Sequence, residues 1–429
     1  MSATEAPSSD APAPEAERHA TWKELFFDLV VVAGIAQLTP LVHEDSATRG
    51  LGLYAVLFVA FWITWAGFAV YGDIAGDDAR TPVLLVAMVG LAIMAASVPE
   101  IRGSHATAFI VSYVALRWFA VGIWQRGKVV LDWPLAQQGL GAVPWIASLW
   151  VDAPGRYWLW ATGIAIDLAT LLLSSPERTM QGAQDRFARV RDSRRGRVRD
   201  SRQGRVRDSR QGVPDSELVL EAARTDDAHL SERLGLFVII VLGEGVIQII
   251  DAVAGLETWH LSTAVTALGA FVLLALVWAV GLQYGVAGIP NLRPATVAPR
   301  IVLLLHAALT GTLAALAAAL GVAVEHHGEA LPANIHVLIC GAVAVYCTIG
   351  VVTALLVGTN WRWLLGWGLP SIALPVLLAT LGTNVRVGLL VWLLAGGLLW
   401  LVLNSPGRPT PWERPERTRE GRRPGRPRR

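Results

Sequence analysis

The sequence predicts an all-α membrane protein, and three observations support this. Hydrophobic residues make up 53% of the 429 residues and charged residues only 16%, with a mean hydropathy of +0.47. A soluble protein of this size needs more charge to cover its surface. Apolar runs recur along the chain at about the 20 residues that one membrane-spanning helix requires. Arginine gathers in one central segment and in the C-terminal tail, which is typical of cytoplasmic loops.

We count twelve candidate spans and expect a polytopic helix bundle. The approximate ranges are 22–43, 51–71, 81–98, 106–125, 135–151, 156–174, 233–253, 260–285, 299–323, 335–357, 363–381 and 385–403. With both termini in the cytoplasm, the outer loops would hold only Arg49, Arg102, Arg156 and Arg386. Because cytoplasmic loops carry the excess of Lys and Arg, an even number of spans in each half satisfies the charge pattern.

The segments outside the spans differ from them in composition. Residues 1–20 are rich in Ala, Pro and acidic residues, so we expect a disordered cytoplasmic tail, and residues 404–429 form a basic cytoplasmic tail. The cytoplasmic loop over 175–231 contains three octads, RVRDSRRG, RVRDSRQG and RVRDSRQG. One interpretation is an anchor on anionic lipid head groups, tunable through Ser193, Ser201 and Ser209. The favoured one is a repeat expansion in a tolerant loop; neither predicts nucleic-acid binding.

The two halves of the chain look like copies of each other. Phe26, Gly34 and Gln37 match Phe237, Gly245 and Gln248 at a constant offset, and WAGFAVYG from Trp65 matches WAVGLQYG from Trp278. Because six spans is an even number, two such copies would be parallel repeats over 21–174 and 232–403, with a site at their interface. Chance likeness between apolar helices is the alternative, but the preserved order of the matches favours duplication.

Four charged residues fall within predicted spans: Asp28, Arg117, Asp167 and Glu244. A charge at the bilayer centre costs about 2.5–3.5 kcal/mol, so an intramembrane acid indicates a functional site. We expect these residues to form one buried substrate-binding or ion-binding network, with Arg117 as the counter-ion. The alternative is that the charges hold the helices together and have no other role.

Other polar residues near the ends or middle of the spans have simpler explanations. Gln37 and Gln248 would line the same cavity as the acids, or make interhelical hydrogen bonds. Glu24 and Glu232 lie where two helices are expected to begin, and Thr21 three residues before Glu24 predicts a capping box.

The remaining acidic and histidine clusters lie in predicted loops. Asp77 and Asp78 occupy a short inner loop, where a solvated turn is favoured over a gate. A group on the outer side contains metal-ligand residue types, namely Glu325, His326, His327, Glu329 and His336. Its spacing matches no metal motif, so we expect no metal site.

Several blocks of the sequence resemble a known family. TWKELFFDLVVVAGIAQLTPLV, FWITWAGFAVYGDIAGDDART and HLSERLGLFVIIVLGEGVIQII are similar to the bacterial low temperature requirement A family. The resemblance implies a multi-pass protein of the bacterial inner membrane, named for a cold-growth phenotype and with no established reaction. This sequence departs from the family pattern at IAGDD, where FDTDD is usual, and at Gly245, where Ser is common.

The functional expectation is a secondary transporter or proton-coupled permease for a small molecule or ion. The opposing hypothesis is a non-transporting structural or sensory membrane protein involved in cold or stress adaptation. The sequence contains no P-loop, dinucleotide fingerprint, GxSxG or CxxC motif. An intramembrane enzyme would have acids available but no recognisable nucleophile, so we expect neither an enzyme nor a cofactor.

Overall fold

The computed structural model shows a bundle of long helices. It describes residues 19–43, 47–76, 79–124, 128–136, 138–185, 188–189, 221–284, 297–356, 364–382 and 384–403. Most of these residues are helical, and the described strands form one two-stranded parallel sheet. The N-terminal tail before residue 19, the octads, Asp77 and Asp78, and the basic C-terminal tail lie outside the described residues.

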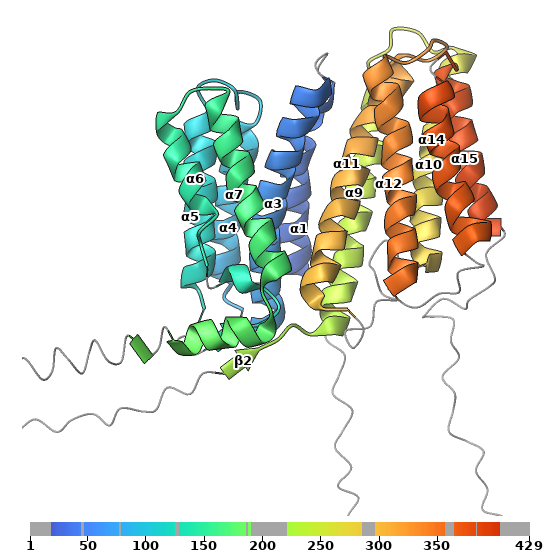
Figure 1. Ribbon diagram of the computed structural model, residues 1–429. Coiled ribbons are helices and arrows are strands. Elements are labelled where there is room, and N and C mark those ends of the chain that lie inside the picture. Colours follow the sequence, from blue (N-terminus) through green and yellow to red (C-terminus); the bar gives the residue numbers. More distant parts are fainter. Residues whose placement is uncertain are drawn as a thin grey trace, which may run out of the picture.

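The elements divide into two groups that stand side by side (Figure 1). The first group contains α1 (Trp22–Ala36), α2 (Thr39–Val42), α3 (Ala47–Ala75), α4 (Thr81–Ser97), α5 (Ala106–Gly122), α6 (Ala142–Ala147) and α7 (Gly155–Leu173). The second contains α9 (Asp227–Ala254), α10 (Leu261–Tyr284), α11 (Pro299–Glu325), α12 (Ala333–Leu356), α14 (Leu369–Leu381) and α15 (Val387–Leu403). A π-helical turn, Leu364–Gly368, precedes α14.

Six helices of the described chain are long and apolar enough to cross a membrane. They are Trp22–Val42, Arg49–Ala75, Asp227–Ala254, Leu261–Gly281, Pro299–Glu325 and Ala333–Leu356. The helix pair Gly155–Leu173 and Pro176–Asp185, bent by 106°, passes the same test as one unit. Helices α4, α5, α14 and α15 are apolar but shorter. The multi-pass character is therefore shown, and the count of twelve spans stays a prediction.

The continuous helix expected over 135–151 is wrong. The segment forms a 3-10 turn (Pro134–Ala136), the six-residue helix α6 and a second 3-10 turn (Ser148–Trp150). Gly139 and Gly141 precede α6, and Pro144 lies inside its first turn, where its missing N–H costs little. The residues between the turns therefore support only a short helix.

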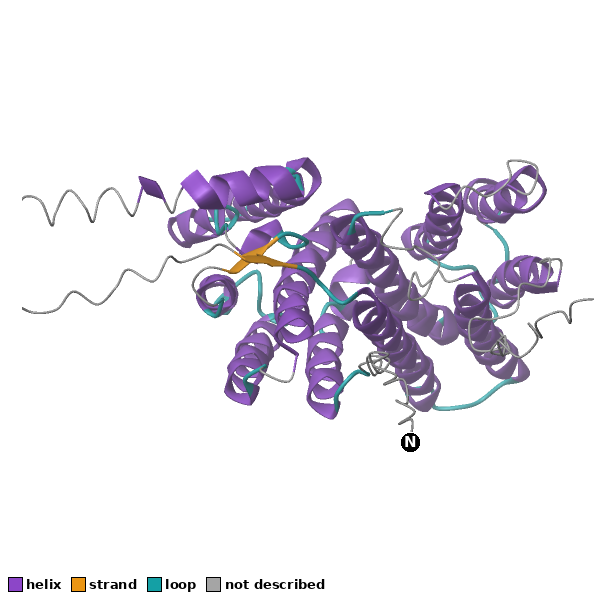
Figure 2. Cartoon of the chain, turned by 90° about the horizontal axis from the view of Figure 1, so that it is seen from below, coloured by secondary structure: helices purple, strands orange, loops and turns teal. Residues whose placement is uncertain are grey.

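One end of the first group carries the small sheet. Strand β1 (Lys128–Val130) pairs in parallel with β2 (Glu221–Ala223), and both lie across the end of the bundle in Figure 2. Met180 and Ala183, on the helix that follows the 106° bend, pack against Val129 and Leu131. The segments entering and leaving the central Arg-rich loop are therefore both held on residues 128–131.

The two groups share one core along α1, α3, α9 and α11. A single cluster of buried apolar residues extends through both groups. Polar contacts also join them, since the Tyr54 hydroxyl donates to the Gly311 carbonyl at 2.8 Å and Trp62 Nε1 donates to His306 Nδ1 at 3.4 Å. Many large apolar side chains on the outer helix faces are exposed, which suits contact with lipid.

Candidate functional site

Helix α9 begins earlier than the sequence pattern suggested. Its N-cap is Asp226, whose carboxylate accepts hydrogen bonds from the backbone N–H groups of Ala228 and His229. The first helical residue is Asp227, so Arg233 lies nearly two turns inside the helix instead of at its edge. His229 and Arg233 are four residues apart, and therefore share one helix face.

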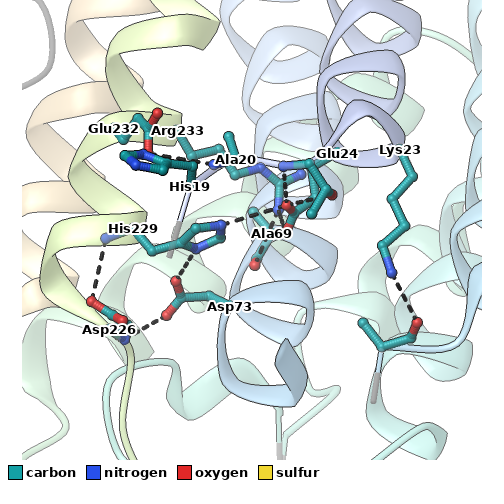
Figure 3. A network of polar contacts seen from close by, with 12 residues as sticks. His19, Ala20, Lys23, Glu24, Ala69, Asp73, Asp226, His229, Glu232 and Arg233 are labelled. Carbon is teal, nitrogen blue, oxygen red and sulfur yellow. Dashed lines mark hydrogen bonds and ion pairs between the residues drawn. The ribbon is translucent and has the colours of Figure 1, made fainter. Parts of the chain in front are cut away.

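That face of α9 packs against α1 and α3 and completes a buried set of charges. We call Glu24, Asp28, Asp73, His229 and Arg233 the charge network. Figure 3 labels Glu24, Asp73, His229 and Arg233. Glu24 and Asp28 come from α1, again four residues apart, and Asp73 comes from α3. Each of the five residues is at most 4% exposed. The network therefore lies at the interface of the two halves.

Arg233 and Asp28 form the deeper part of the charge network. Arg233 Nη2 donates to Asp28 Oδ1 at 2.9 Å, and Arg233 Nε donates to Asp28 Oδ2 at 3.3 Å. Trp65 Nε1 also donates to Asp28 Oδ1, at 2.7 Å. The guanidinium carbon lies 5.8 Å from the centre of the Phe27 ring. This two-pronged pairing is the geometry that holds a buried Arg and carboxylate most firmly.

His229 forms the part nearer the start of α9. Its Nδ1 lies 2.6 Å from Asp73 Oδ1, and its Nε2 lies 3.5 Å from Glu24 Oε2. The second oxygen of Asp73 accepts from the backbone N–H of Asp226 at 2.6 Å. Both ring nitrogens therefore face carboxylates. A charged imidazole can donate to both acids and a neutral one only to one, so this geometry depends on the protonation state of His229.

Glu24 has two roles. The predicted capping box is confirmed, with the backbone N–H and hydroxyl of Thr21 donating to Glu24 Oε2 at 2.9 and 2.7 Å. The same carboxylate lies 3.6 Å from Arg233 Nη1. Glu232 does not cap α9, because the helix begins five residues before it. Its side chain is 39% exposed and lies 3.3 Å from His19 Nδ1.

The expected single network of Asp28, Arg117, Asp167 and Glu244 is wrong. Arg117 Nη2 donates to Asp167 Oδ1 at 2.8 Å, which makes a separate pair between α5 and α7. In the described part of the chain, neither Asp28 nor Glu244 forms an ion pair with Arg117. The physical reason is that Arg233 already neutralises Asp28. Glu244 lies about 16 Å from Arg233 along the axis of α9.

Glu244 lies beside a small cavity instead. Gln248 Nε2 donates to Glu244 Oε1 at 2.8 Å, and both side chains are half-buried. They line a cavity of about 10 Å³ together with Thr39 and Tyr54. Gln37 is exposed and is not among its lining residues, so the expectation that both glutamines share a cavity with the acids is wrong.

The outer histidines have local partners. His336 Nε2 lies 2.8 Å from the Leu378 carbonyl oxygen, and His326 Nδ1 lies 3.0 Å from that of Val322. Within the described residues, no group of three or more His, Cys, Asp or Glu side chains is arranged to hold a metal ion.

Sequence reasoning missed Trp65, Asp73, His229 and Arg233. A signal was present, because His229 and Arg233 in HLSER repeat the four-residue spacing of Glu24 and Asp28 in ELFFD. Because α1 begins at Trp22 and α9 at Asp227, both pairs face the interface between these two helices. The missing information was the start of α9, without which Arg233 reads as a residue at the membrane surface.

The apolar helices and the buried charges define a multi-pass integral membrane protein. The chain belongs to the bacterial low temperature requirement A protein (LtrA) family, whose profile matches residues 19–404. An uncharacterized protein of Rhizobium meliloti (strain 1021) is 26% identical over 260 residues, covering 54% of this chain and 50% of that relative. The chain thus matches about half the length of this relative. No solved structure shows significant similarity.

Proposed function

We propose that the protein is a proton-coupled permease and that the charge network is its proton-binding centre. The observation that carries this proposal is the position of His229 between Asp73 and Glu24, at 2.6 and 3.5 Å. An imidazole with a carboxylate on each side can receive a proton from one acid and pass it to the other. Histidine suits this exchange, since its ordinary pKa of about 6.5 lies near physiological pH.

The charge balance favours proton binding as well. Among the described residues, the charge network contains three carboxylates and one guanidinium. Its formal charge is therefore −2 with a neutral His229 and −1 with a charged His229. A buried net charge is costly, so the network gains stability by taking up protons or another cation. A permease needs a group of this kind to couple ion movement to a conformational change.

The packing of the helices supports the proposed duplication. Helix α1 packs against α3 and α4, and α4 packs against α5. In the same way, α9 packs against α10 and α11, and α11 packs against α12. The correspondence continues with α6 against α7 and α14 against α15. We infer two parallel repeats, in which α1 and α9 are equivalent helices with the charge network between them.

Gly34 and Gly245, which match in the sequence, have equivalent surroundings. A Cβ atom at Gly34 would lie 2.8 Å from Phe61 Cε1 on α3 and 3.4 Å from Ala95 on α4. At Gly245 it would lie 2.9 Å from Leu274 Cδ1 on α10 and 3.2 Å from Ala317 on α11. Both glycines thus let the first helix of a half approach the second and third closely, as expected if one unit had been copied.

An apolar segment separates the charge network from the Glu244 cavity. Val31 on α1 and Phe237 on α9 are fully buried, and the Phe237 ring lies 4.4 Å from that of Trp65. Val32 and Val241 line the near side of the cavity. We propose that this apolar segment blocks the path between the charge network and the Glu244 cavity. Alternating access would then require α1 and α9 to move apart, which would connect the network to Glu244.

The positive-inside pattern gives the orientation that we propose. The ends of the central Arg-rich segment lie at the same end of the bundle as the start of α9 and the charge network (Figure 1). That end would face the cytoplasm of a bacterial cell, where the basic segments would contact anionic lipid head groups. Protons from the cytoplasm would then reach the charge network, and protons from outside the cell would reach Glu244.

Proton movement in proteoliposomes tests the proposal. Purified protein is reconstituted with a pH-sensitive dye inside, and a membrane potential is imposed. We expect wild type to carry protons, and His229→Gln and Asp28→Asn to lose most of this flux while eluting normally from a sizing column. His260→Gln, at an exposed loop histidine, is the matched control and should behave like wild type.

Two results would overturn the proposal. The first is a wild-type flux no greater than that of protein-free liposomes under a range of imposed gradients. The second is normal flux in both folded variants, which would leave the charge network with a structural role. That second result would favour the alternative function, a structural or sensory membrane protein.

A further inference from the structure

A cavity of about 280 Å³ lies in the second half, between α12, α14 and α15. Its lining includes Val343 of α12, Ser371 of α14 and Leu398 of α15, which are all buried. It is far larger than the cavity of about 10 Å³ beside Glu244. An engineered apolar cavity of about 150 Å³ binds benzene, so this one has room for about ten carbon atoms.

The lining of this cavity is apolar. Among the described residues it consists of valine, leucine, proline, glycine and tryptophan, with one serine. The hydroxyl of that serine, Ser371, donates to the Gly368 carbonyl oxygen at 2.7 Å, so its hydrogen already has an acceptor. A bound water needs about two to four polar partners, and apolar cavities stay dry. The lining therefore favours a hydrocarbon ligand over ions and polar solutes.

The first half has an aromatic side chain where the second half has this cavity. PWIA from Pro144 matches PSIA from Pro370, so Trp145 and Ser371 are equivalent under the proposed duplication. Trp145 is fully buried, and its ring stacks on that of Trp160 with 5.1 Å between the ring centres. Ser371 has no such ring, and it lines the cavity instead. An apolar ligand would thus occupy the kind of space that an indole fills in the first half.

The cavity opens on the outer side of the bundle. Pro370 and Trp400 belong to its lining and are exposed, and Trp400 is 60% exposed. Helices α14 and α15 lie at the edge of the second group farthest from the first group (Figure 1). Along α15 the lining extends from Leu394 to Leu401, which is about 10 Å of helix. An elongated apolar cavity that opens toward the bilayer fits an acyl chain better than a compact molecule.

We propose that this cavity binds one acyl chain of a membrane phospholipid, which enters between Pro370 of α14 and Trp400 of α15. Trp400 suits the rim of such a site, because tryptophan favours the interface between membrane and water. The lipid chain then fills a space that the side chains of the second half leave open. The comparison of the two halves rests on the proposed duplication, whereas proton transport by the charge network is not required.

Photo-crosslinking of the full-length protein in proteoliposomes tests this site. The liposomes contain a small fraction of a phosphatidylcholine with a diazirine in one acyl chain, and labelled residues are located by mass spectrometry. We expect Leu398 and Leu401 to be labelled several times more than Leu390 and Val391. The last two residues are matched controls, because they are equally buried on α15 but do not line the cavity. Labelling of Leu398 and Leu401 no stronger than that of the controls would overturn the proposal.

The variant Ser371→Trp gives the second half the indole that fills the first half. We expect labelling of Leu398 and Leu401 to fall to the level of the buried controls. Leu377→Trp is the matched variant, since Leu377 is also on α14 but is 53% exposed and does not line the cavity, and it should label like wild type. Wild-type labelling in folded Ser371→Trp would contradict the proposal. Val343→Phe fills the cavity from α12 and provides the same test if Ser371→Trp does not fold.

Two features of the experiment make its outcome specific. Labelling by a diazirine-bearing alkane but not by the phospholipid would show a general apolar cavity, and would count against a lipid site. The labelling is measured without a pH gradient, so it does not depend on proton flux. A protein that carries no protons but is labelled at Leu398 and Leu401 would therefore lose the proposed permease function and keep the lipid site.

Discussion

Breaking the Asp28–Arg233 pair should strongly destabilise the protein. Asp28 accepts three hydrogen bonds, of which Arg233 donates two, at 2.9 and 3.3 Å. Hydrogen bonds to charged groups contribute about 1.5–3 kcal/mol each, so two of them amount to about 3–6 kcal/mol. Removing one partner of a buried ion pair costs about 3–5 kcal/mol by direct comparison. We therefore expect Asp28→Asn and Arg233→Met each to lower the free energy of unfolding by about 3–5 kcal/mol.

The assay is reversible unfolding in mixed micelles by titration with a denaturing detergent. Glu232→Gln is the control, since it removes a charge from the neighbouring residue, whose side chain is 39% exposed, and should change stability by less than about 0.5 kcal/mol. The double variant, Asp28→Asn with Arg233→Met, should lose much less than the sum of the two single losses, because neither charge is left alone. A loss from Asp28→Asn no larger than that from Glu232→Gln would refute the reasoning.

Three further changes test the packing and the start of α9 in the same unfolding assay. Gly141→Ala should destabilise the protein by at least about 1–3 kcal/mol, because its Cβ would overlap the Asp167 carboxylate. Gly243→Ala meets no atom within 4 Å and should stabilise α9 by up to about 1 kcal/mol, so equal effects at the two glycines would contradict the packing. Asp226→Ala should cost about 0.5–2 kcal/mol through loss of the N-cap, and a neutral result would mean that α9 does not start there.

The sequence was sufficient to predict the class of protein and the long apolar helices. Apolar runs of sufficient length identify such helices directly, because the bilayer sets their length. The same rule failed at residues 135–151, where glycines and Pro144 divide an apolar run into two turns and one short helix. The apolar composition of a run indicates that it is buried. Its glycines and prolines decide whether the buried run forms one continuous helix.

The candidate site could be predicted only in part. Asp28 was recognised as an unusual acid and Glu24 as a capping residue at the start of the first helix, and both belong to the charge network. Their partners were not found, since pairing depends on how far α9 extends before Arg233 and on which face of α3 carries Asp73. Arg117 was expected to join Asp28, Asp167 and Glu244 in one network, but among these acids it pairs only with Asp167. Depth in the membrane can be read from the sequence, but the neighbour across a helix interface cannot.

The most direct test of the account is the protonation of His229, measured by nitrogen NMR on protein labelled at histidine. The resonances of His229 are those that disappear in His229→Gln. We predict that they change between the neutral and charged imidazole forms as the pH is varied. His306 is a buried reference, because its Nε2 lies 3.2 Å from the Leu234 carbonyl oxygen and its Nδ1 accepts from Trp62, so it should stay neutral. A His229 signal that keeps one form at every pH would contradict the proton-binding centre.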